Sequence, residues 1–201
     1  MNHASRSPRI VLTGGPGGGK TTAADLFRRE IGETVVIVPE TATMLFSGGF
    51  PRAKEDEAVQ HAQRAIYHTQ VALEAVQGER FPDRMLLCDR GTLDGAAYWP
   101  GPDEAFYEAM GTTLQAELAR YDAVLHFESA AAGGERIEGG NPVRTETNAE
   151  AAALDRRIAE LWGDHPRFHF VPHRSSFLEK LREGLELLDH VAHSNGWLVR
   201  D

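Results

Sequence analysis

The chain has 201 residues, of which 41% are hydrophobic and 25% charged, and its formal net charge is −9 at pH 7. This length fits one α/β domain, expected over residues 1–201, and an acidic chain without clusters of Lys and Arg argues against a nucleic-acid-binding protein. The polar N-terminus lacks a signal-peptide core and no segment is apolar enough to span a membrane, so we expect a cytoplasmic protein without membrane contacts.

Short apolar runs alternate with helical patterns, which is typical of βαβ units and a parallel sheet. Strands are expected at residues 9–13, 34–38, 85–88, 123–127 and 168–171. Helices are expected at residues 20–31, 55–77, 93–98, 104–119 and 149–162, with a last one after the capping box of Ser176 and Glu179. This last helix is expected to bury Phe177, Leu181, Leu185, Leu188 and Val191.

The first expected strand is followed by a segment that matches the P-loop pattern G-x-x-x-x-G-K-[ST]: Gly14, Gly15, Pro16, Gly17, Gly18, Gly19, Lys20 and Thr21, with Thr22 next to it. Glycines let successive N–H groups point at a phosphate, and the following helix adds its positive dipole end. Lys20 can reach the β- and γ-phosphates, and Thr21 can offer its hydroxyl to Mg²⁺. The segment therefore predicts binding of a nucleoside triphosphate with Mg²⁺.

The longest expected helix, residues 55–77, carries two stripes. Apolar residues at alternating steps of three and four are expected to face the core: Val59, Ala62, Ile66, Thr69, Leu73 and Val76. A second stripe lies one position around the helix: Gln63, Tyr67, Gln70 and Glu74. It either borders the cleft, where its amides could pair with the edge of an acceptor molecule, or forms a partly exposed flank.

Three acidic residues follow expected strands: Glu40, Asp89 and Glu128. Ligands of open parallel sheets bind beyond the carboxyl ends of the strands, so these side chains are candidates for the site. Asp89 is the candidate Mg²⁺ ligand beside Thr21, and Arg90 next to it could contact phosphate. A solvated turn or a helix N-cap is the structural alternative for each acid, and we favour it for Glu128 and for Asp94.

The pattern is lost after Glu128, and residues 129–148 are expected to form a lid loop. Arg136 and Arg144 in this stretch are either solvated or deliver positive charge to a transferring phosphoryl group. Together these features predict an α/β, three-layer P-loop NTPase fold with a five-stranded parallel sheet and a lid, like that of nucleotide kinases.

The P-loop, the segment Val38-Pro39-Glu40 and the run from Asp89 to Asp94 together resemble the small "AAA domain" family of predicted ATPases. That family is similar to ribosylnicotinamide kinases and, more distantly, to deoxynucleoside kinases. The resemblance implies that Glu40 acts on the acceptor hydroxyl and that Asp89 and Arg90 form an Asp-Arg element. It also implies that Arg144 belongs to an Arg-x-Glu lid motif. The chain departs from the deoxynucleoside kinases in having Gly91 in place of Ser and fewer lid arginines.

Two functions follow from these residues. The first is a small-molecule kinase that transfers the γ-phosphoryl group of ATP to a nucleoside-like or other hydroxyl acceptor. Glu40 or Asp89 would be the base, and Lys20, Arg90 and Arg144 would stabilise the transferring group. An acceptor pocket is expected from Tyr67, Gln70, Tyr98, Trp99 and Phe106.

The alternative is a regulatory ATPase or GTPase that signals to a protein partner. The [NT]-K-x-D tetrapeptide that reads guanine is absent from the sequence, which favours ATP while GTP stays open. A nucleotide-binding structural module without turnover is a third reading. Whether the chain forms a homo-oligomer is left open.

Overall fold

The computed structural model describes residues 6–134 and 147–198. Five strands pair in parallel in the order β2-β3-β1-β4-β5. Their bounds are Arg9–Thr13 (β1), Val35–Val38 (β2), Met85–Asp89 (β3), Ala123–Phe127 (β4) and Phe168–Val171 (β5). All five strands expected from the sequence are confirmed. The order places β1 at the centre, so the loop that follows it lies in the middle of the sheet's carboxyl edge.

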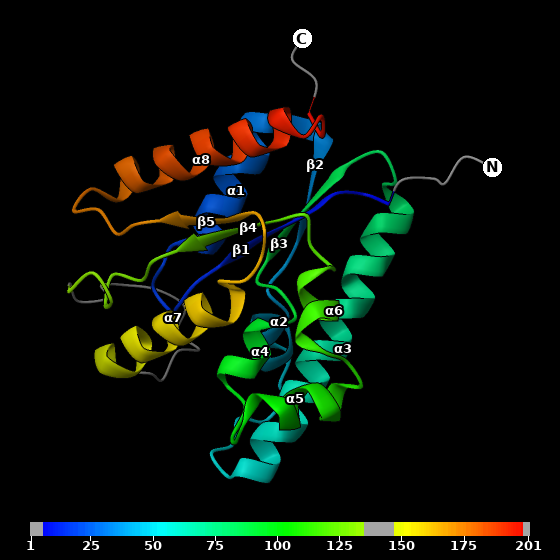
Figure 1. Ribbon diagram of the computed structural model, residues 1–201, viewed down its shortest axis with the longest axis vertical. Coiled ribbons are helices and arrows are strands. Elements are labelled where there is room, and N and C mark those ends of the chain that lie inside the picture. Colours follow the sequence, from blue (N-terminus) through cyan, green and yellow to red (C-terminus); the bar gives the residue numbers. More distant parts are fainter. Residues whose placement is uncertain (1–5, 135–146, 199–201) are drawn as a thin grey trace.

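Helices cover both faces of the sheet and give three layers (Figure 1). One face is covered by α1 (Lys20–Ile31) and α8 (Phe177–Ser194). The other face is covered by α3 (Asp56–Arg80), α4 (Asp94–Ala97), α5 (Asp103–Met110), α6 (Leu114–Leu118) and α7 (Asn148–Trp162). A 3-10 turn, η1 (Gly32–Thr34), leads into β2, and a short helix, α2 (Thr41–Ser47), follows that strand.

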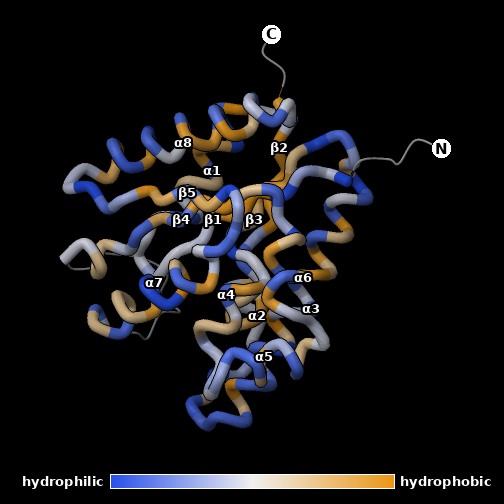
Figure 2. The backbone as a smooth tube through the Cα atoms, in the orientation of Figure 1, coloured by the Kyte–Doolittle hydropathy of each residue, from blue (hydrophilic) through white to orange (hydrophobic). Residues whose placement is uncertain are grey.

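The sheet separates two apolar cores. Successive strand residues point to opposite faces, so Ile10 and Leu12 pack with α1 and α8 while Val11 packs with the helices of the other layer. All three side chains are fully buried. Figure 2 shows hydrophobic residues gathered along the central strands, while hydrophilic and hydrophobic residues alternate along the helices. Burial on both faces explains why the strands are continuous apolar runs.

Two helical predictions are wrong in detail. The segment expected as one helix over residues 104–119 forms α5 and α6, because Gly111 adopts a left-handed φ of 67° and ends α5. The helix α2 was not predicted, since it has only seven residues and too little periodic pattern to detect.

The long helix predicted over residues 55–77 is confirmed as α3, but the face expected to be buried is wrong. On α3 the buried side chains are Ala62, Gln63, Tyr67, Gln70 and Glu74. These are largely the polar stripe, whereas Val76 of the apolar stripe is 52% exposed. Tyr67, Gln70 and Glu74 can occupy this face because their hydrogen bonds are satisfied by other buried groups. Of the residues expected to be buried on the last helix, Leu181, Leu188 and Val191 are buried and Leu185 is partly buried against the same core, but Phe177 is 46% exposed.

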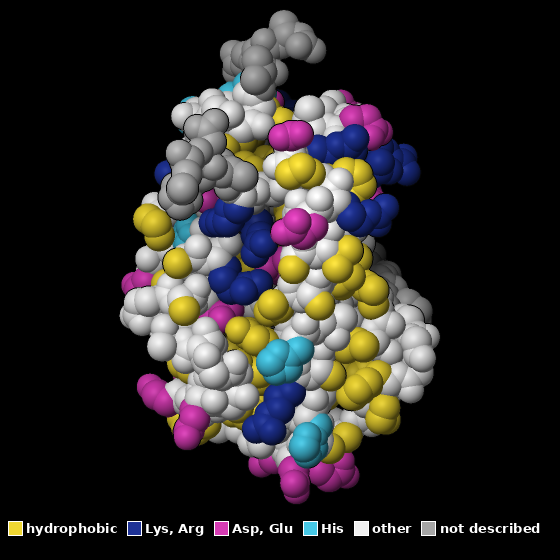
Figure 3. Space-filling model, turned by 90° about the vertical axis from the view of Figure 1, so that its right-hand side faces the viewer, with side chains coloured by type: hydrophobic (Ala, Val, Ile, Leu, Met, Phe, Trp, Pro, Cys, Tyr) yellow, Lys and Arg dark blue, Asp and Glu magenta, His cyan; other side chains and the backbone are white. Residues whose placement is uncertain are grey.

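The surface carries no continuous basic face in the view of Figure 3. Lys and Arg side chains form separate groups there, with acidic and hydrophobic side chains between them. Within the described part of the chain, no helix has both the length and the apolar character needed to cross a bilayer.

Candidate functional site

The P-loop joins β1 to α1 and contains three glycines in the left-handed region. The φ angles are 127° at Gly14, 81° at Gly17 and 84° at Gly19. A Cβ at Gly14 would also collide with the backbone carbonyl of Phe127. Glycine is therefore required by both conformation and space at Gly14. The turn that results presents the start of α1 at the carboxyl edge of the sheet, where an anion can be bound.

Lys20 is buried at the first position of α1. Its Nζ donates to the carbonyl oxygens of Gly14 and Gly15, each at 2.8 Å. Burial and the nearby positive charge of Arg90 lower the pKa of Lys20 to about 7. The amino group of Lys20 is thus held beside the P-loop backbone, where it can interact with a phosphate.

Thr21 and Asp89 meet where α1 begins and β3 ends. The Thr21 hydroxyl donates to Asp89 Oδ2 at 2.6 Å. Asp89 is 2% exposed, and its Oδ1 has no hydrogen-bond partner among the described residues. Burial and the charge of Glu40 raise the pKa of Asp89.

These groups fit Mg²⁺. A hydroxyl and a carboxylate with an unpaired oxygen are hard oxygen donors, and Mg²⁺ is usually held by one or two such groups together with phosphates and water. In the described ranges, no cluster of three or more His, Cys, Asp or Glu side chains could form an all-protein metal site. Thr21 and Asp89 are therefore candidate ligands for a metal that would be bound together with a phosphate.

Arg90 connects the P-loop with two carboxylates. Its Nε donates to Glu40 Oε1 at 2.5 Å, and its NH1 group donates to Asp94 Oδ2 at 3.1 Å and to the Gly14 carbonyl at 3.2 Å. Arg90 is the one non-glycine residue in the described chain with a positive φ, 75°. Backbone strain of this kind persists only where the surroundings hold it, and it is enriched at functional sites.

The Arg90 guanidinium controls the charge of Glu40. Burial on its own would raise the pKa of Glu40, but Arg90, the Thr43 hydroxyl and Lys20 lower it to about 2. Asp94 is placed by other contacts, because its Oδ1 accepts from the Thr13 hydroxyl and from Trp162 Nε1, both at 2.7 Å. Asp94 therefore anchors Arg90 to the sheet and to α7.

Two further charged residues support the P-loop, and the sequence reading missed both. Asp155 on α7 accepts from Gly15 N at 2.6 Å and from Ser129 N at 2.9 Å. Lys180 on α8 donates to the Gly18 carbonyl at 2.8 Å and to the Glu128 carbonyl. Asp155 Oδ2 also lies 3.3 Å from His126 Nε2. Nothing in the local sequence of Asp155 and Lys180 distinguishes them from surface residues, because their partners are far away in the chain.

Glu128, the third strand-end acid, has a role in the loop after β5. Its Oε2 accepts from the backbone N–H of His173 at 2.7 Å. The structure thus brings Glu40 and Asp89 together with the P-loop, while Glu128 binds backbone.

A cavity of about 330 Å³ opens beside the P-loop. It is lined by Pro16, Glu40, Arg90, the segment Arg52–Lys54 and side chains from α2, α3 and the segment Gly91–Tyr98. Of the expected pocket residues, Tyr67, Gln70 and Tyr98 line this cavity. Trp99 and Phe106 are not part of its wall: Phe106 packs behind Tyr67, with ring centroids 6.0 Å apart, and Trp99 packs against Phe106.

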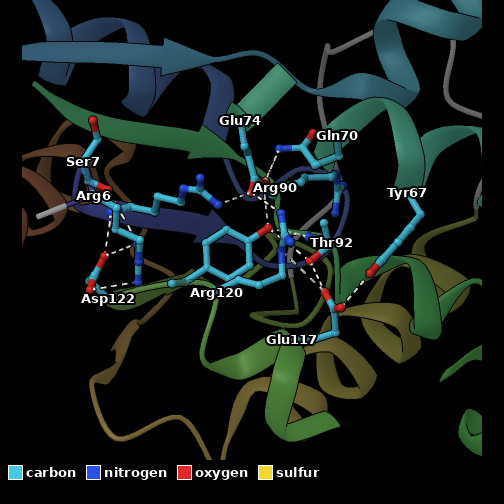
Figure 4. Close-up of polar contacts among 12 residues, drawn as sticks. Arg6, Ser7, Tyr67, Gln70, Glu74, Arg90, Thr92, Glu117, Arg120 and Asp122 are labelled. Atoms are coloured by element: carbon cyan, nitrogen blue, oxygen red, sulfur yellow. Dashed lines mark hydrogen bonds and ion pairs between the residues drawn. The ribbon is translucent and has the colours of Figure 1, made fainter. Parts of the chain in front are cut away.

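A buried polar network orients the cavity wall (Figure 4). Gln70 accepts from the Thr41 hydroxyl at 2.5 Å and donates to Glu74 Oε1 and to the Arg90 carbonyl. Glu74 is fully buried and also binds Arg120, Arg9 and Tyr121. The amide of Gln70 is therefore fully engaged and is not available to pair with an acceptor.

The other two polar residues of this stripe that line the cavity, Tyr67 and Gln63, differ in whether their polar groups already have hydrogen-bond partners. The Tyr67 hydroxyl donates to Glu117 Oε1 at 2.7 Å, in the second half of the network (Figure 4). Gln63 lines the cavity and is 9% exposed, yet among the described residues its amide has no hydrogen-bond partner. Gln63 is thus the amide of the α3 stripe that remains open to a ligand.

The predicted lid lies mostly outside the described residues. Its first residues, up to Gly134, form a turn, and α7 begins at Asn148. Arg136 and Arg144 both fall in the range 135–146, outside the described chain.

Comparisons with known proteins agree with this geometry. A family model described as an AAA domain matches residues 9–180. Thymidylate kinase from Candida albicans has a similar structure, with a TM-score of 0.61 over 98% of this chain and 96% of that chain, at 14% sequence identity. At that identity the likeness concerns the fold, which is the predicted P-loop NTPase fold. A comparison with curated proteins found none with significant sequence similarity. The family match spans the P-loop, both strand-end carboxylates and α7, and the chain therefore belongs to the AAA domain family.

Proposed function

We propose that this protein is a Mg²⁺-dependent kinase that transfers the γ-phosphoryl group of ATP to a hydroxyl group of a small molecule bound in the cavity beside the P-loop. The observation that carries the proposal is the position of Glu40. Its carboxylate lines the cavity and binds Arg90, which in turn contacts the P-loop carbonyl of Gly14. Acceptor site and phosphate site are therefore joined by two side chains.

Glu40 and Asp89 have separate roles in this proposal. Asp89 binds the Thr21 hydroxyl and is not part of the cavity wall, so it serves the metal side. Glu40 faces the cavity and stays ionised, so it orients the acceptor hydroxyl and accepts its proton. A carboxylate with a low pKa is a weak base, but phosphoryl transfer through a loose transition state needs positioning more than strong base catalysis.

The ionised carboxylate of Glu40 favours a hydroxyl as the group that reacts at this end of the cavity, because a hydroxyl can donate its hydrogen to the carboxylate whereas a phosphate dianion is repelled by it. Nε and NH1 of Arg90 already bind Glu40, Asp94 and a carbonyl. Arg52 and Lys54 also line the cavity, and Lys20 lies close enough to Glu40 to lower its pKa. The choice of a hydroxyl therefore rests on the position of Glu40 and not on the net charge of the wall.

The remaining wall suits a nucleoside-like molecule. Phe46, Tyr67 and Tyr98 supply aromatic surface, and Gln63 offers one acceptor and two donors in a plane. Such an amide can pair with the edge of a base or of another amide. This supports, within the kinase proposal, a ring with a polar edge as the far part of the acceptor.

ATP and Mg²⁺ complete the proposed reaction. Mg²⁺, when bound by Thr21 and Asp89, would neutralise charge on the β- and γ-phosphates. Lys20 supplies a second positive charge beside the loop, and Arg144 remains the predicted cation of the lid. The arrangement positions the acceptor oxygen and neutralises the transferring group, which is the main contribution a protein makes to this chemistry.

A turnover assay with matched acceptors tests the proposal. The protein is incubated with Mg²⁺ and ATP and with nucleosides, ribosides, sugars and the 5′-monophosphates of the same nucleosides, and both ADP and phosphorylated product are measured. We expect product from a hydroxyl compound and none from a 5′-monophosphate, with activity abolished by Lys20→Ala. ADP formation at the same rate with and without every acceptor would instead favour the regulatory ATPase or GTPase.

A further inference from the structure

The order of the strands gives the bound triphosphate a direction. Glu40, Asp89 and the cavity lie at the ends of β2 and β3, on one side of the central P-loop. The γ-phosphate must point toward this side, because the proposed acceptor and the Thr21–Asp89 pair are there. The nucleoside end of the triphosphate must then extend in the opposite direction, past the carboxyl ends of β4 and β5. In Figure 1 the start of α8 lies at the carboxyl ends of these two strands.

The ring of Phe177 contacts the P-loop on this side. It is the first residue of α8, whose N-cap Ser176 accepts a hydrogen bond from Glu179 N at 3.3 Å. The ring lies against Gly19: a Cβ built on that glycine would be 2.5 Å from Phe177 Cε2. The cap fixes the helix start, and the contact with the loop fixes the ring.

The exposure of Phe177 is not explained by the core. The apolar face of α8 is already formed by Leu181, Leu188 and Val191, which are at most 5% exposed. Phe177 packs one side on the P-loop and leaves 46% of its surface in solvent. An aromatic ring held in place with an open face can stack on a nucleobase, and such stacking does not depend strongly on which base it is.

We propose that the ring of Phe177 is the stacking platform for the base of the nucleoside triphosphate. This inference rests on the proposed function, because it assumes that the P-loop binds the triphosphate. The proposed role of Phe177 gives a base-binding side chain to a sequence that lacks the guanine-reading tetrapeptide. It also implies that the bases of ATP and GTP stack on the same ring. Specificity between them would have to come from other contacts.

The test compares ATP with a ligand that has no base. Inorganic tripolyphosphate occupies the phosphate cradle alone, so calorimetric titration of Mg²⁺–ATP and of Mg²⁺–tripolyphosphate separates the two parts of the site. The variants are Phe177→Ala, Phe177→Tyr and the matched control Phe170→Ala. Phe170 is equally exposed, at 48%, but its ring stacks on His126 at 5.4 Å.

We expect Phe177→Ala to weaken Mg²⁺–ATP binding by about tenfold, the size of effect typical for loss of one stacked base, and to leave tripolyphosphate binding unchanged. Phe177→Tyr should restore ATP binding, and Phe170→Ala should bind both ligands as the natural protein does. Unchanged ATP binding in Phe177→Ala would overturn the inference. So would an equal loss of ATP and tripolyphosphate, since the ring would then only support the loop, and so would an equal loss of ATP in Phe170→Ala.

The proposed function fails by a different result. If the natural protein binds neither Mg²⁺–ATP nor Mg²⁺–tripolyphosphate, the P-loop is not a triphosphate site and both ideas are wrong. If it binds both and Lys20→Ala weakens both, the phosphate site stands, and the behaviour of Phe177→Ala decides the base platform alone.

Discussion

Arg90 Nε and Glu40 Oε1 lie 2.5 Å apart, although the two residues are separated by 50 positions and follow different strands. β2 and β3 are neighbours in the sheet, so the residues that follow them meet at one edge. This pair forms the boundary between the P-loop and the cavity.

Removing the Glu40 carboxylate should stop turnover without stopping nucleotide binding. We expect Glu40→Gln to lower kcat by about 10²-fold, the low end for loss of a general base, because the amide can still accept from Arg90 but cannot take a proton. The affinity for Mg²⁺–ATP should change little. Steady-state kinetics with calorimetric titration checks both, with exposed Glu57→Gln as a control. An unchanged kcat would show that Glu40 is not the base.

The same pair predicts a pH effect on stability. The pKa of Glu40 is about 2 in the folded protein, against an ordinary value of 4.5. A lowered carboxyl pKa stabilises the fold above pH 4.5, by about 3 kcal/mol in full, and this contribution is lost as the pH falls toward 2. The stability difference between the natural protein and Glu40→Gln should therefore narrow by about 1 kcal/mol between pH 5.5 and 3.5. Urea unfolding at the two pH values measures it; a constant difference contradicts the prediction.

Asp89 should act on binding through the metal. Asp89→Asn keeps the size of the side chain and an oxygen for the Thr21 hydroxyl but removes the charge. We expect it to weaken ATP binding with Mg²⁺ by about 10–100-fold and to change ATP binding in EDTA far less. Titration of ATP with Mg²⁺ and with EDTA separates the two. Equal weakening under both conditions would mean that Asp89 supports the P-loop and not the metal.

The contact between α7 and the P-loop should contribute measurably to the free energy of unfolding. Asp155→Ala leaves the buried N–H groups of Gly15 and Ser129 without their acceptor and removes the partner of the buried His126 ring, which should cost at least about 1–3 kcal/mol in the free energy of unfolding. Glu160→Ala on the same helix, whose side chain is 70% exposed, is the control and should change stability by less than about 0.5 kcal/mol. Denaturant unfolding of both variants gives the comparison, and similar losses would contradict the assigned role.

Gln63 and Gln70, both on α3, should respond in opposite ways to removal of the side-chain amide. Gln70→Leu breaks hydrogen bonds to Thr41, Glu74 and the Arg90 carbonyl, so it should destabilise the protein by about 1–3 kcal/mol. Gln63→Leu removes an amide without a partner among the described residues, so stability should hold. In the assay that identifies the acceptor, Gln63→Leu should raise the acceptor KM and leave the ATP KM unchanged. Destabilisation by Gln63→Leu would show that its amide has a structural role.

Most of the fold was readable from the sequence because the signals are local. Parallel strands that are buried on both faces appear as continuous apolar runs, and the five runs were found within one residue of their observed ends. The P-loop was equally clear, since its glycines, Lys20 and Thr21 act through backbone conformation and fixed spacing. The prediction that the apolar stripe of α3 faces the core was wrong. Hydrophobic periodicity cannot show that Glu74 will be buried with Arg9, Arg120 and Tyr121 as hydrogen-bond partners.

The sequence by itself therefore determined the phosphate cradle, the strand-end carboxylates and the family, all of which depend on residues that are close together in the chain. Only the tertiary structure decided that Glu40 faces the cavity and Asp89 the Thr21 hydroxyl, that Gln63 is open while Gln70 is engaged, and that Phe177 lies on the P-loop. The physical reason is that each of these relationships joins residues from different elements, and their distances are fixed only when the sheet order and the packing of helices are in place.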